Sequence, residues 1–445
     1  MVNGHGHRVV IVGGGFAGLY AARALGKARS IELTLIDRRN YHLFQPLLYQ
    51  VATGALSPGD IAQPLRSIVG RNTNTRVLLG EALRLDPAAH RVVLSDGGTV
   101  EYDTLIVATG AHHAYFGHDD WATLSPGLKT IEDATDIRHR ILIAYEAAER
   151  ETDPVRRAEW MTFVVVGAGP TGVELAGALG EISRDTLRRD FRSIHPADAR
   201  VLLVEAADRV LPGYPESLSS SARRQLEHLG VSVRTQTRVT EIDEGGVDVS
   251  AGGDHGQSSE RISTRTVLWA AGVQASSFGR KVAEALGAEV DRTGRVPVGP
   301  DLSVPGHAEV LIVGDLAVVM RPDGRIVPGV APAAIQEGKY AAESTLARLG
   351  GKPVRPFRYR DRGDVAVIGR LSGVADIRWL GRLGRRSGFI AWMLWLSVHI
   401  LYLIGFANRL VVIIRWAWSF LTHGRGARLI TGEPHLPPIK RPENL

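Results

Sequence analysis

The chain contains no cysteine among its 445 residues. This absence excludes a disulfide scaffold, an iron–sulfur cluster, a cysteine-ligated zinc site and a thiol nucleophile. It also excludes the flavoenzymes that work through a redox-active cysteine pair. Hydrophobic residues make up 44% of the sequence, which is too apolar for disorder, and 22 prolines are too few for collagen. The length suggests two or three domains with a substantial core.

A secretory signal is also missing. Met1–His7 leads directly into an apolar strand, without the basic region, apolar core and cleavage site of such a signal. This pattern favours a chain that stays on the cytoplasmic side of the membrane.

Acidic residues are scarce in the last fifth of the chain. Residues 355–445 carry 15 Lys or Arg but only 5 Asp or Glu, a net charge of +10, whereas the preceding residues carry −4. A basic segment is typical of contact with nucleic acid or with an anionic membrane surface. Five of the eight tryptophans lie there, within aliphatic runs rather than among arginines: Trp379, Trp392, Trp395, Trp416 and Trp418. This distribution favours a membrane surface, with nucleic acid as the weaker alternative.

Two apolar runs lie in this basic segment. Phe389–Phe406 has 18 residues without a formal charge and just meets the length of a spanning helix, whereas Leu410–Leu421 has 12 residues and is too short. Asn408 and Arg409 are expected to separate the runs. Tryptophans at the outer ends and basic flanks favour two helices lying in the membrane interface; the flanks are Arg382, Arg385, Arg386, Arg425 and Arg428. A spanning helix and a buried core helix are the alternatives.

Three apolar runs with the character of strands end in glycine clusters. They are Arg8–Val12 before Gly13–Gly18, Thr162–Val166 before Gly167–Gly172, and Val310–Val313 before Gly314 and Asp315. Helical stretches, Leu19–Ala28 and Val173–Ser183, follow the first two clusters. A strand, a glycine turn and a helix open a βαβ unit, and this unit occurs twice. The sequence therefore predicts an α/β fold with two Rossmann-like dinucleotide-binding domains and a C-terminal membrane-associating helical segment.

The first glycine motif is complete. In Gly-x-Gly-x-x-Gly the first glycine makes the tight turn, the second lets the backbone approach a pyrophosphate, and the third lets helix and strand pack closely. Gly13, Gly15 and Gly18 occupy these positions, and the strand Ile31–Ile36 leads to Asp37. Asp37 lies 19 residues after the last glycine, where a carboxylate accepts hydrogen bonds from a ribose. A glycine turn with a chance acid is the alternative that this combination disfavours.

The second motif has the same parts: Gly167, Gly169 and Gly172, and then Glu205 after the strand Arg200–Val204. The acid lies 33 residues beyond the last glycine, so an insertion at about residues 184–198 must lengthen the helix or its exit loop. A carboxylate here repels a 2′-phosphate and favours NADH over NADPH. Arg209 lies close enough in sequence to blur this preference, but a solvated surface charge is the favoured interpretation of it.

A third glycine site supports a bound flavin. Two dinucleotide sites in one chain imply two dinucleotides, most economically FAD and a nicotinamide cofactor, between which hydride passes readily. Asp315, after Gly314, is placed to bond ribityl hydroxyls, with a helix N-cap as the alternative. The strand exits Ile106–Gly110 and Leu268–Gly272 match each other, and each is predicted to cover the edge of its own dinucleotide.

The predicted domain order is 1–115 for the first part of the FAD-binding domain, 116–158 for a helical connector, 159–275 for the NADH-binding domain, 276–345 for the return to the FAD-binding domain, and 346–445 for the C-terminal membrane-anchoring domain. Residues 251–260 are expected to form a polar hairpin or loop.

In these features the chain resembles the two-dinucleotide-binding-domain flavoproteins, and more narrowly the type II NADH:quinone oxidoreductases, which are single-subunit NADH dehydrogenases that pump no protons. The segment Asn40–Gly54 resembles the family's segment that passes near the isoalloxazine, and Gly167–Glu174 resembles its NADH loop. The likeness extends through Gly388–Glu433 and covers nearly the whole chain.

The motifs and the resemblance together imply the cofactor-binding residues. For FAD they are Gly13, Gly15, Phe16, Ala17, Gly18, Asp37, Arg38, Gln45, Thr53, Ala82, Ala108, Thr109, Gly110, Gly314 and Asp315. For NADH they are Gly167, Gly169, Pro170, Thr171, Gly172, Glu205, Ala271 and Gly272. No metal-ligand cluster is apparent in the sequence, and the reaction needs no nucleophile.

The family's quinone-site motif, Ala-Gln-x-Ala-x-Gln-x-Gly, corresponds to Ala331–Gly338, which reads Ala-Pro-Ala-Ala-Ile-Gln-Glu-Gly. Gln336 is kept, but Pro332 replaces the first glutamine and removes one amide from the expected quinone pocket. This change bears on the quinone head group more than on the reaction. The alternative for Gln336 is an ordinary polar helix residue, and Pro332 suits the first turn of a helix.

Glu174 lies on the first turn of the helix that follows the second glycine motif. The resemblance implies that this residue organises nicotinamide and quinone or assists proton movement. We therefore predict that its carboxyl relays or positions a proton for quinol formation, with Gln336 as the second catalytic residue. The alternative is an acid that the helix macrodipole favours. His399 is expected to be a core or interface histidine rather than part of a quinone channel.

The resemblance thus implies FAD-dependent oxidation of NADH with two-electron reduction of a membrane quinone, menaquinone or ubiquinone, at the cytoplasmic face of the cell membrane. An anionic lipid surface is an expected partner, nucleic acid is not, and a homodimer is left open. One alternative is a flavin-dependent NAD(P)H reductase of another acceptor, such as a ferredoxin-like protein or a specialised quinone. Another is a membrane-docked redox-sensing flavoprotein. The missing cysteines exclude disulfide reductases and sulfide:quinone reductases.

Overall fold

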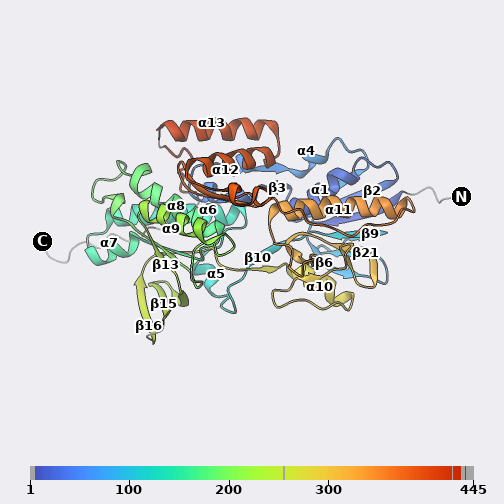
Figure 1. Ribbon diagram of the computed structural model, residues 1–445, viewed down its shortest axis with the longest axis horizontal. Helices are drawn as coiled ribbons and strands as arrows, with labels where there is room; N and C mark the ends of the chain where they lie inside the picture. Colours follow the sequence, from blue (N-terminus) through green and yellow to red (C-terminus); the bar gives the residue numbers. More distant parts are fainter. Residues whose placement is uncertain (1–5, 254–255, 423, 432–435, 437–445) are drawn as a thin grey trace. The chain divides into compact units, whose positions relative to one another are not determined.

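The computed structural model describes residues 6–253, 256–422, 424–431 and 436, and the chain divides into two compact units (Figure 1). Unit 1 consists of Met1–Leu43, Ala62–His112 and Val273–Asp361. Unit 2 consists of Phe44–Ile61, His113–Gly272 and Arg362–Leu445. The α/β class predicted from the sequence is confirmed. Residues 44–61 belong to unit 2, where Asp60 forms an ion pair with Arg415 at 3.1 Å between Oδ2 and Nε.

Unit 1 is built on a six-stranded sheet in the order β20-β21-β9-β1-β2-β5. The strands are β1 His7–Val12, β2 Ile31–Asp37, β5 Thr75–Leu79, β9 Thr104–Val107, β20 Ser303–Val304 and β21 His307–Ile312. Neighbours are parallel except β20 and β21. Buried Val, Ile and Leu dominate the central strands, as a sheet covered on both faces requires. The parallel order places the carboxyl ends of β1, β2 and β9 at one edge, where Gly13, Asp37 and Ala108 lie.

Two helices of unit 1, α1 Phe16–Leu25 and α11 Ala331–Leu349, pack directly on each other (Figure 1). A Cβ on Gly338 of α11 would lie 2.0 Å from the Ala17 carbonyl oxygen of α1, so the two backbones touch there. The α1 helix begins three residues before the predicted start, because it follows the glycine turn directly. Pro332 lies in the first turn of α11.

The remaining elements of unit 1 are short: β3 Tyr41–Leu43, β4 Ala62–Pro64, α4 Leu65–Val69, β6 Ala82–Asp86, β7 Arg91–Leu94, β8 Thr99–Glu101, β18 Val273–Ala275, α10 Ser277–Ala285, β19 Val296–Pro297, the 3₁₀ helix η4 Gly314–Leu316 and β22 Ala317–Val318. The strand β10 Ala111–His113 runs from unit 1 into unit 2 along the chain.

Unit 2 contains a second parallel sheet, in the order β13-β12-β11-β17. Its elements are β11 Thr162–Val166, α8 Pro170–Glu181, β12 Arg200–Val204, α9 Glu216–His228, β13 Val231–Arg234 and β17 Thr266–Trp269. The insertion expected at about 184–198 begins as a π-helical turn, Ile182–Thr186, that continues α8, and it ends in a 3₁₀ helix, Pro196–Asp198. The insertion therefore lengthens both the helix and its exit.

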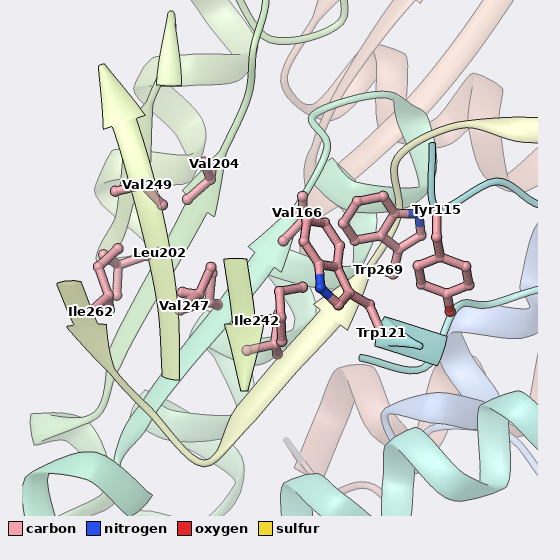
Figure 2. Close-up of a cluster of buried hydrophobic side chains, with 12 residues drawn as sticks. Tyr115, Trp121, Val166, Leu202, Val204, Ile242, Val247, Val249, Ile262 and Trp269 are labelled. Carbon is pink, nitrogen blue, oxygen red and sulfur yellow. The ribbon is translucent and has the colours of Figure 1, made fainter. Parts of the chain in front are cut away.

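Further elements of unit 2 surround this sheet: η1 Gln45–Leu47, α2 Leu48–Ala52, α3 Pro58–Ile61, α5 Trp121–Leu124, α6 Ile131–Arg150, α7 Pro154–Trp160, β14 Thr237–Asp243, β15 Gly246–Gly253 and β16 Gly256–Ser263. The hairpin expected at 251–260 is formed by β15 and β16, and its residues 254–255 lie outside the described residues. Figure 2 shows the side chains of Tyr115, Trp121 and Trp269 gathered in a buried cluster with Val166. This cluster fixes the end of β17 beside the second glycine turn.

The C-terminal part of unit 2 has a three-stranded sheet and two helices: β23 Asp364–Gly369, β24 Ser372–Asp376, η5 Arg378–Gly384, β25 Arg385–Ser387, α12 Phe389–Tyr402 and α13 Phe406–Thr422. The helices separate at Gly405, whose φ is +90°, and Asn408 and Arg409 lie inside α13 rather than between the helices as the sequence suggests. Arg409 donates to the carbonyl oxygens of Leu403 at 2.6 Å and Leu401 at 3.0 Å, and so caps the end of α12. Among the described residues, none of the helices combines the length and apolarity that a bilayer span requires.

Candidate functional site

The first glycine turn brings β1, α1 and β9 into contact. A Cβ on Gly13, whose φ is +106°, would lie 2.3 Å from the Ala108 carbonyl oxygen, and one on Gly18 would lie 1.8 Å from the Gly13 carbonyl oxygen. Around Gly15, by contrast, no described atom lies within 4 Å of a Cβ position. Gly15 is the N-cap of α1, so the free N–H groups of the first helical turn border this opening.

The second glycine turn repeats this geometry in unit 2. A Cβ on Gly172 would lie 1.8 Å from the Gly167 carbonyl oxygen, and one on Gly167, whose φ is +96°, would lie 2.8 Å from the Ala271 nitrogen. Gly169 is the N-cap of α8, and the space beside it is open within the described structure. Pro170 and Thr171 begin α8 and are exposed. At both turns the pyrophosphate of a dinucleotide can therefore lie close to the backbone.

Each turn has a carboxylate at the same place. Asp37 accepts a hydrogen bond from the Gly14 N–H at 2.5 Å and one from the Arg39 N–H at 2.7 Å. Glu205 accepts one from the Ala168 N–H at 2.6 Å and one from the Ala207 N–H at 2.8 Å. Burial raises the pKa of Asp37, while the two N–H groups oppose that shift. The structure thus holds both acids against their glycine turns, with acceptor sites left for a ribose.

The strand exits beside the two turns have matching conformations. Gly110 has a φ of +65° and Gly272 a φ of +69°. The Thr109 hydroxyl lies 2.5 Å from the Ser276 hydroxyl and is fixed within unit 1. Because Ala108 touches the first turn and Ala271 the second, each exit lies against the glycine turn of its own unit.

The third glycine site lies where β21 meets α11. Gly314, whose φ is +77°, begins η4, and a Cβ there would lie 3.5 Å from the Ala17 Cβ. Asp315 lies within η4, whose N-cap is Val313, so the N-cap alternative for Asp315 does not hold. The Gly314 N–H donates to Glu337 Oε2 at 2.6 Å. This site belongs to unit 1, the unit that holds the first glycine turn.

The other residues of unit 1 that are expected to bind FAD lie in α1, after β2 and in β6. Phe16 and Ala17 form the first turn of α1, and the Phe16 ring meets the His42 ring edge to face at 5.1 Å between centroids. Arg38 follows β2 and is exposed, and Ala82 opens β6. The glycine turn, Asp37 and these residues share one unit.

Two residues expected on the flavin side lie in unit 2. Gln45 Nε2 donates to the Lys129 carbonyl oxygen at 3.3 Å. Thr53 is buried, and its hydroxyl donates to the Tyr49 carbonyl oxygen at 2.8 Å within its own helix. Both side chains therefore have partners within unit 2.

Glu174 is buried among α8, β23 and α12, all of unit 2, and only 9% of the residue is exposed. Its Oε1 accepts a hydrogen bond from Trp395 Nε1 at 3.2 Å and one from the Val367 N–H at 3.4 Å. Burial raises the pKa of this carboxyl from 4.5 to about 8, which the two hydrogen bonds oppose. Glu174 is thus a buried acid that holds its proton at neutral pH, not a solvated acid at a helix N-terminus.

Two tryptophans of the C-terminal helices donate into the interior of unit 2. Trp395 bonds Glu174, and Trp416 Nε1 donates to Gln50 Oε1 at 2.7 Å. Gln50 in turn donates to the Tyr49 hydroxyl at 2.9 Å, and the Tyr49 ring meets the Trp395 ring edge to face. Burial, assisted by Glu174, raises the pKa of Tyr49. The helices α12 and α13 are therefore tied by their indoles to α8 and α2.

His399 lies in the same region as a buried histidine. Its ring stacks on Trp395 at 4.2 Å, and its Nδ1 lies 2.7 Å from the Trp395 carbonyl oxygen. Burial lowers the pKa of His399 to about 4, so the ring is neutral and Nδ1 donates. This is a core histidine, as the sequence suggests.

The helix α8 also touches strand β23 along its length. A Cβ on Gly177 would lie 1.7 Å from the Ile368 carbonyl oxygen, so helix and strand meet backbone to backbone. Glu174 accepts from this strand one turn before Gly177, and Glu181 accepts from the Arg370 N–H one turn after it. The helix that follows the second glycine turn is thus rigidly joined to the C-terminal sheet.

Gln336 lies in α11 of unit 1 and uses its whole amide on the main chain. Its Nε2 donates to the carbonyl oxygens of Pro332 and Arg360, each at 3.1 Å, and its Oε1 accepts from the Arg360 N–H at 2.9 Å. The residue therefore fixes the segment around Arg360 to the first turns of α11.

Large apolar side chains are exposed along the C-terminal elements of unit 2. They include Trp379, Leu380, Leu383, Phe389, Ile390, Met393, Val398, Leu401, Leu410, Val411, Ile413, Ile414, Trp418, Phe420 and Leu421. Leu401, Trp418 and Leu421 are 69%, 66% and 74% exposed. Arg382 and Arg386 are exposed beside them. We call these side chains of η5, β25, α12 and α13 the tail surface. Apolar area of this extent marks an interaction site.

The sequence does not predict several residues of the site in the places where the structure has them. Trp395, Tyr49 and Gln50 surround or approach Glu174, yet Trp395 is 221 positions away along the chain. Tyr49 and Gln50 lie inside the segment Asn40–Gly54, whose likeness to the family was the available signal. Glu337 lies inside the quinone-site motif at a position that the motif leaves free.

The residues present fit two dinucleotides. Each unit has a glycine turn with an open centre at a helix N-terminus and an acid at the end of the next strand. Unit 1 adds the Gly314–Asp315 site, which suits the ribityl chain of FAD, whereas Glu205 in unit 2 suits the diol of NADH.

The sequence matches the pyridine nucleotide-disulphide oxidoreductase family over residues 7–338. Two type II NADH:quinone oxidoreductases of Mycobacterium tuberculosis, Ndh and NdhA, are 46% and 47% identical to it. Each alignment covers 96% of this chain, and 91% of Ndh and 90% of NdhA. A type II NADH:quinone oxidoreductase of Haemophilus influenzae is 27% identical, over 83% of this chain and 86% of its own.

Solved structures have the same fold. NDH2 from Plasmodium falciparum in complex with NADH superposes with a TM-score of 0.82 at 18% identity, over 93% of this chain and 98% of its own. The sulfide:quinone oxidoreductase of Aquifex aeolicus gives a TM-score of 0.70 at 18% identity, over 89% and 90%.

Proposed function

Because the chain belongs to the type II NADH:quinone oxidoreductases within the pyridine nucleotide-disulphide oxidoreductase family, we propose that it oxidises NADH and reduces a membrane quinone by two electrons, without pumping protons. The observation that carries this proposal is the pair of complete glycine turns, each with its own acid, in a chain without cysteine. When bound, FAD supplies the redox chemistry that links the two substrates.

The proposed roles of the residues follow from their places. In unit 1, the turn from Gly13 to Gly18 and Asp37 hold the adenosine and pyrophosphate of FAD, and Asp315 holds its ribityl chain. In unit 2, the turn from Gly167 to Gly172 holds the pyrophosphate of NADH. Glu205 accepts from the ribose hydroxyls and repels a 2′-phosphate, which gives NADH preference over NADPH.

Of the two residues predicted to be catalytic, we propose a direct role for Glu174 and a positioning role for Gln336. Glu174 is buried and holds a proton at neutral pH, and a neutral carboxyl there can donate toward a quinone that gains electrons. Gln336 holds the Arg360 segment in place, and Pro332, where the family has a second amide, leaves quinone recognition to fewer polar groups. The natural quinone is menaquinone or ubiquinone in this proposal.

Purified protein is expected to be yellow, to release FAD on denaturation and to oxidise NADH only when a quinone is added. The measurement is NADH absorbance at fixed flavin content, with NADPH and with menaquinone and ubiquinone analogues. NADPH is expected to be the poorer donor by about 100-fold, which corresponds to a cost of about 2.7 kcal/mol for placing the 2′-phosphate beside Glu205. Folded protein that carries no flavin, or that carries flavin without NADH:quinone turnover, would contradict the proposal.

We further propose that the tail surface rests on anionic lipid at the cytoplasmic face. Its exposed apolar side chains enter the interface, and the net charge of +10 in residues 355–445 attracts the lipid headgroups. The face is tested with membrane vesicles, because NADH does not cross membranes. Inside-out vesicles are expected to oxidise added NADH, and right-side-out vesicles are not.

The triple substitution of Leu401, Trp418 and Leu421 by serine is expected to lower partition onto phosphatidylglycerol vesicles at least about 100-fold. Each side chain contributes about 1 to 2 kcal/mol when it leaves water. Co-flotation with vesicles measures the effect, and Val155→Ser, at another exposed apolar residue of unit 2, is the matched control. A triple variant that floats like the unaltered protein, or unaltered protein that ignores anionic vesicles, would refute the lipid proposal.

A further inference from the structure

Glu337 is a buried carboxyl that the proposed reaction does not use. It lies in α11 of unit 1, and only 3% of the residue is exposed. Its neighbour Gly338 packs on the backbone of Ala17 in the first turn of α1, so Glu337 is held at the point where α11 crosses the first glycine turn. No hydrogen-bond or ion-pair partner for it is found on a Lys or Arg within the described residues.

Within the part of the chain that the structure describes, Glu337 accepts one hydrogen bond, and it comes from the third glycine site. The Gly314 N–H donates to Oε2 at 2.6 Å, and Gly314 has a φ of +77° that favours glycine. Gly314 begins the turn that presents Asp315, and it lies beside Ala17. Without Glu337, this part-buried N–H would lose the acceptor that it has in the described structure, which is costly.

The charged groups around Glu337 determine its protonation state. Asp315 on η4 is the charged group that acts on it, and the α1 helix opposite presents Ala17. A carboxylate buried beside another carboxylate, without a cation, is strongly disfavoured against the neutral acid. In agreement, burial raises the pKa of Glu337 to about 8, and the charge of Asp315 adds to this effect. The hydrogen bond from the Gly314 N–H opposes the shift.

We propose that Glu337 is a positioning residue for FAD, which as a neutral acid fixes the Gly314–Asp315 turn by accepting the Gly314 N–H. This inference rests on the proposed FAD site of unit 1. A neutral acid adds no repulsion toward Asp315 or toward a pyrophosphate at the adjacent glycine turn. Ionisation would place a second negative charge in the same buried region, and FAD affinity should therefore decrease as the carboxyl loses its proton.

The experiment measures FAD release from the purified holoenzyme between pH 6 and pH 9.5, by flavin fluorescence after ultrafiltration. The dissociation constant of the unaltered protein is expected to stay constant up to about pH 7.5 and then to rise up to about tenfold per pH unit above about pH 8. Glu337→Gln keeps an acceptor for the Gly314 N–H and cannot ionise, so its dissociation constant should stay low and flat over the whole range.

Two further variants separate positioning from a general effect of charge. Glu337→Leu removes the acceptor and is expected to weaken FAD binding about tenfold or more at every pH. Glu343→Gln makes the same substitution at an exposed position of α11, away from Gly314, and should retain the rise with pH. If Glu337→Leu does not fold, the comparison of Glu337→Gln with the unaltered protein decides alone.

A Glu337→Gln variant that still loses FAD above pH 8, or a folded Glu337→Leu variant that holds FAD as tightly as the unaltered protein, would overturn this inference. Either result leaves the proposed function intact, because FAD is still bound at neutral pH. Unaltered protein that binds no FAD at any pH would instead contradict the proposed function itself.

Discussion

Replacing Gly172 with alanine is expected to raise the KM for NADH about 100-fold while the purified protein keeps its bound FAD. The added Cβ would lie 1.8 Å from the Gly167 carbonyl oxygen, a backbone atom that cannot swing away. Helix α8 must then move from the end of β11, which opens the turn that receives the pyrophosphate. Such overpacking costs about 1 to 3 kcal/mol or more, most of it expressed in binding. Steady-state kinetics and flavin content together measure the result.

The counterpart in unit 1 should behave in the opposite way. Gly18→Ala places a Cβ 1.8 Å from the Gly13 carbonyl oxygen, and this variant is expected to lose its FAD and with it all turnover. Gly213→Ala is the control, because no described atom lies within 4 Å of that Cβ position and the residue is exposed in unit 2. If Gly172→Ala lost the flavin and Gly18→Ala raised only the KM for NADH, the assignment of FAD to unit 1 and of NADH to unit 2 would have to be reversed.

The glycine turns and their acids were predictable because their signals are local. The tight turn, the close approach of strand and helix and the acid at the next strand end all occur within one βαβ unit. Gly13, Gly18 and Asp37 accordingly have the geometry that the spacing requires, and the 33-residue spacing to Glu205 correctly indicated an insertion. The β strands were predictable for the same reason, since buried apolar runs between glycines leave few alternatives.

The surroundings of Glu174 were not predictable from local patterns. Its partners Trp395 and Val367 come from elements about 200 residues further along the chain, and only packing of β23 on α8 brings them there. The sequence also predicts the wrong boundary between the two C-terminal helices, at Asn408 and Arg409 instead of Gly405, for a related reason. A polar pair such as Asn408 and Arg409 normally interrupts an apolar run, but here Arg409 bonds the carbonyl oxygens that end α12.

The contacts of Gln336 were not predictable from its motif. The motif identifies only the residue type at this position, and Gln336 matches the family there. The structure adds that both polar atoms of its amide bond the main chain of Arg360, a partner 24 positions away that no pattern on α11 indicates. A substitution at Gln336 therefore changes the position of a whole segment as well as one amide.

Replacing Glu174 with glutamine is expected to lower NADH:quinone turnover by about 100-fold, the size of effect that a lost general acid commonly has. Glutamine keeps Oε1 as the acceptor for Trp395 and Val367, so the packing of α8, β23 and α12 should persist. Only the exchangeable proton is removed. Stopped-flow measurement of the two half-reactions should place the loss in quinone reduction, with reduction by NADH nearly unchanged.

The pH profile gives the sharper test of this role. Turnover of the unaltered protein should be flat at neutral pH and fall above about pH 8, where Glu174 ionises, whereas Glu174→Gln should show no inflection there.

The free energy of unfolding depends on the same proton. Because burial raises the pKa of Glu174 from 4.5 to about 8, the native state binds a proton that the unfolded state releases. Its contribution to the free energy of unfolding therefore falls as pH rises from about 4.5 to about 8, and the glutamine variant lacks this part of the slope.

A leucine at the same position separates chemistry from structure. Glu174→Leu leaves the Trp395 and Val367 N–H groups without their acceptor, which costs about 1 to 3 kcal/mol for each buried donor. That variant should therefore be both inactive and less stable, whereas the glutamine variant should be slow but stable. If Glu174→Gln leaves turnover and its pH profile unchanged while Glu174→Leu only unfolds more easily, the carboxyl is a packing group, and the proton for the quinol comes from another donor.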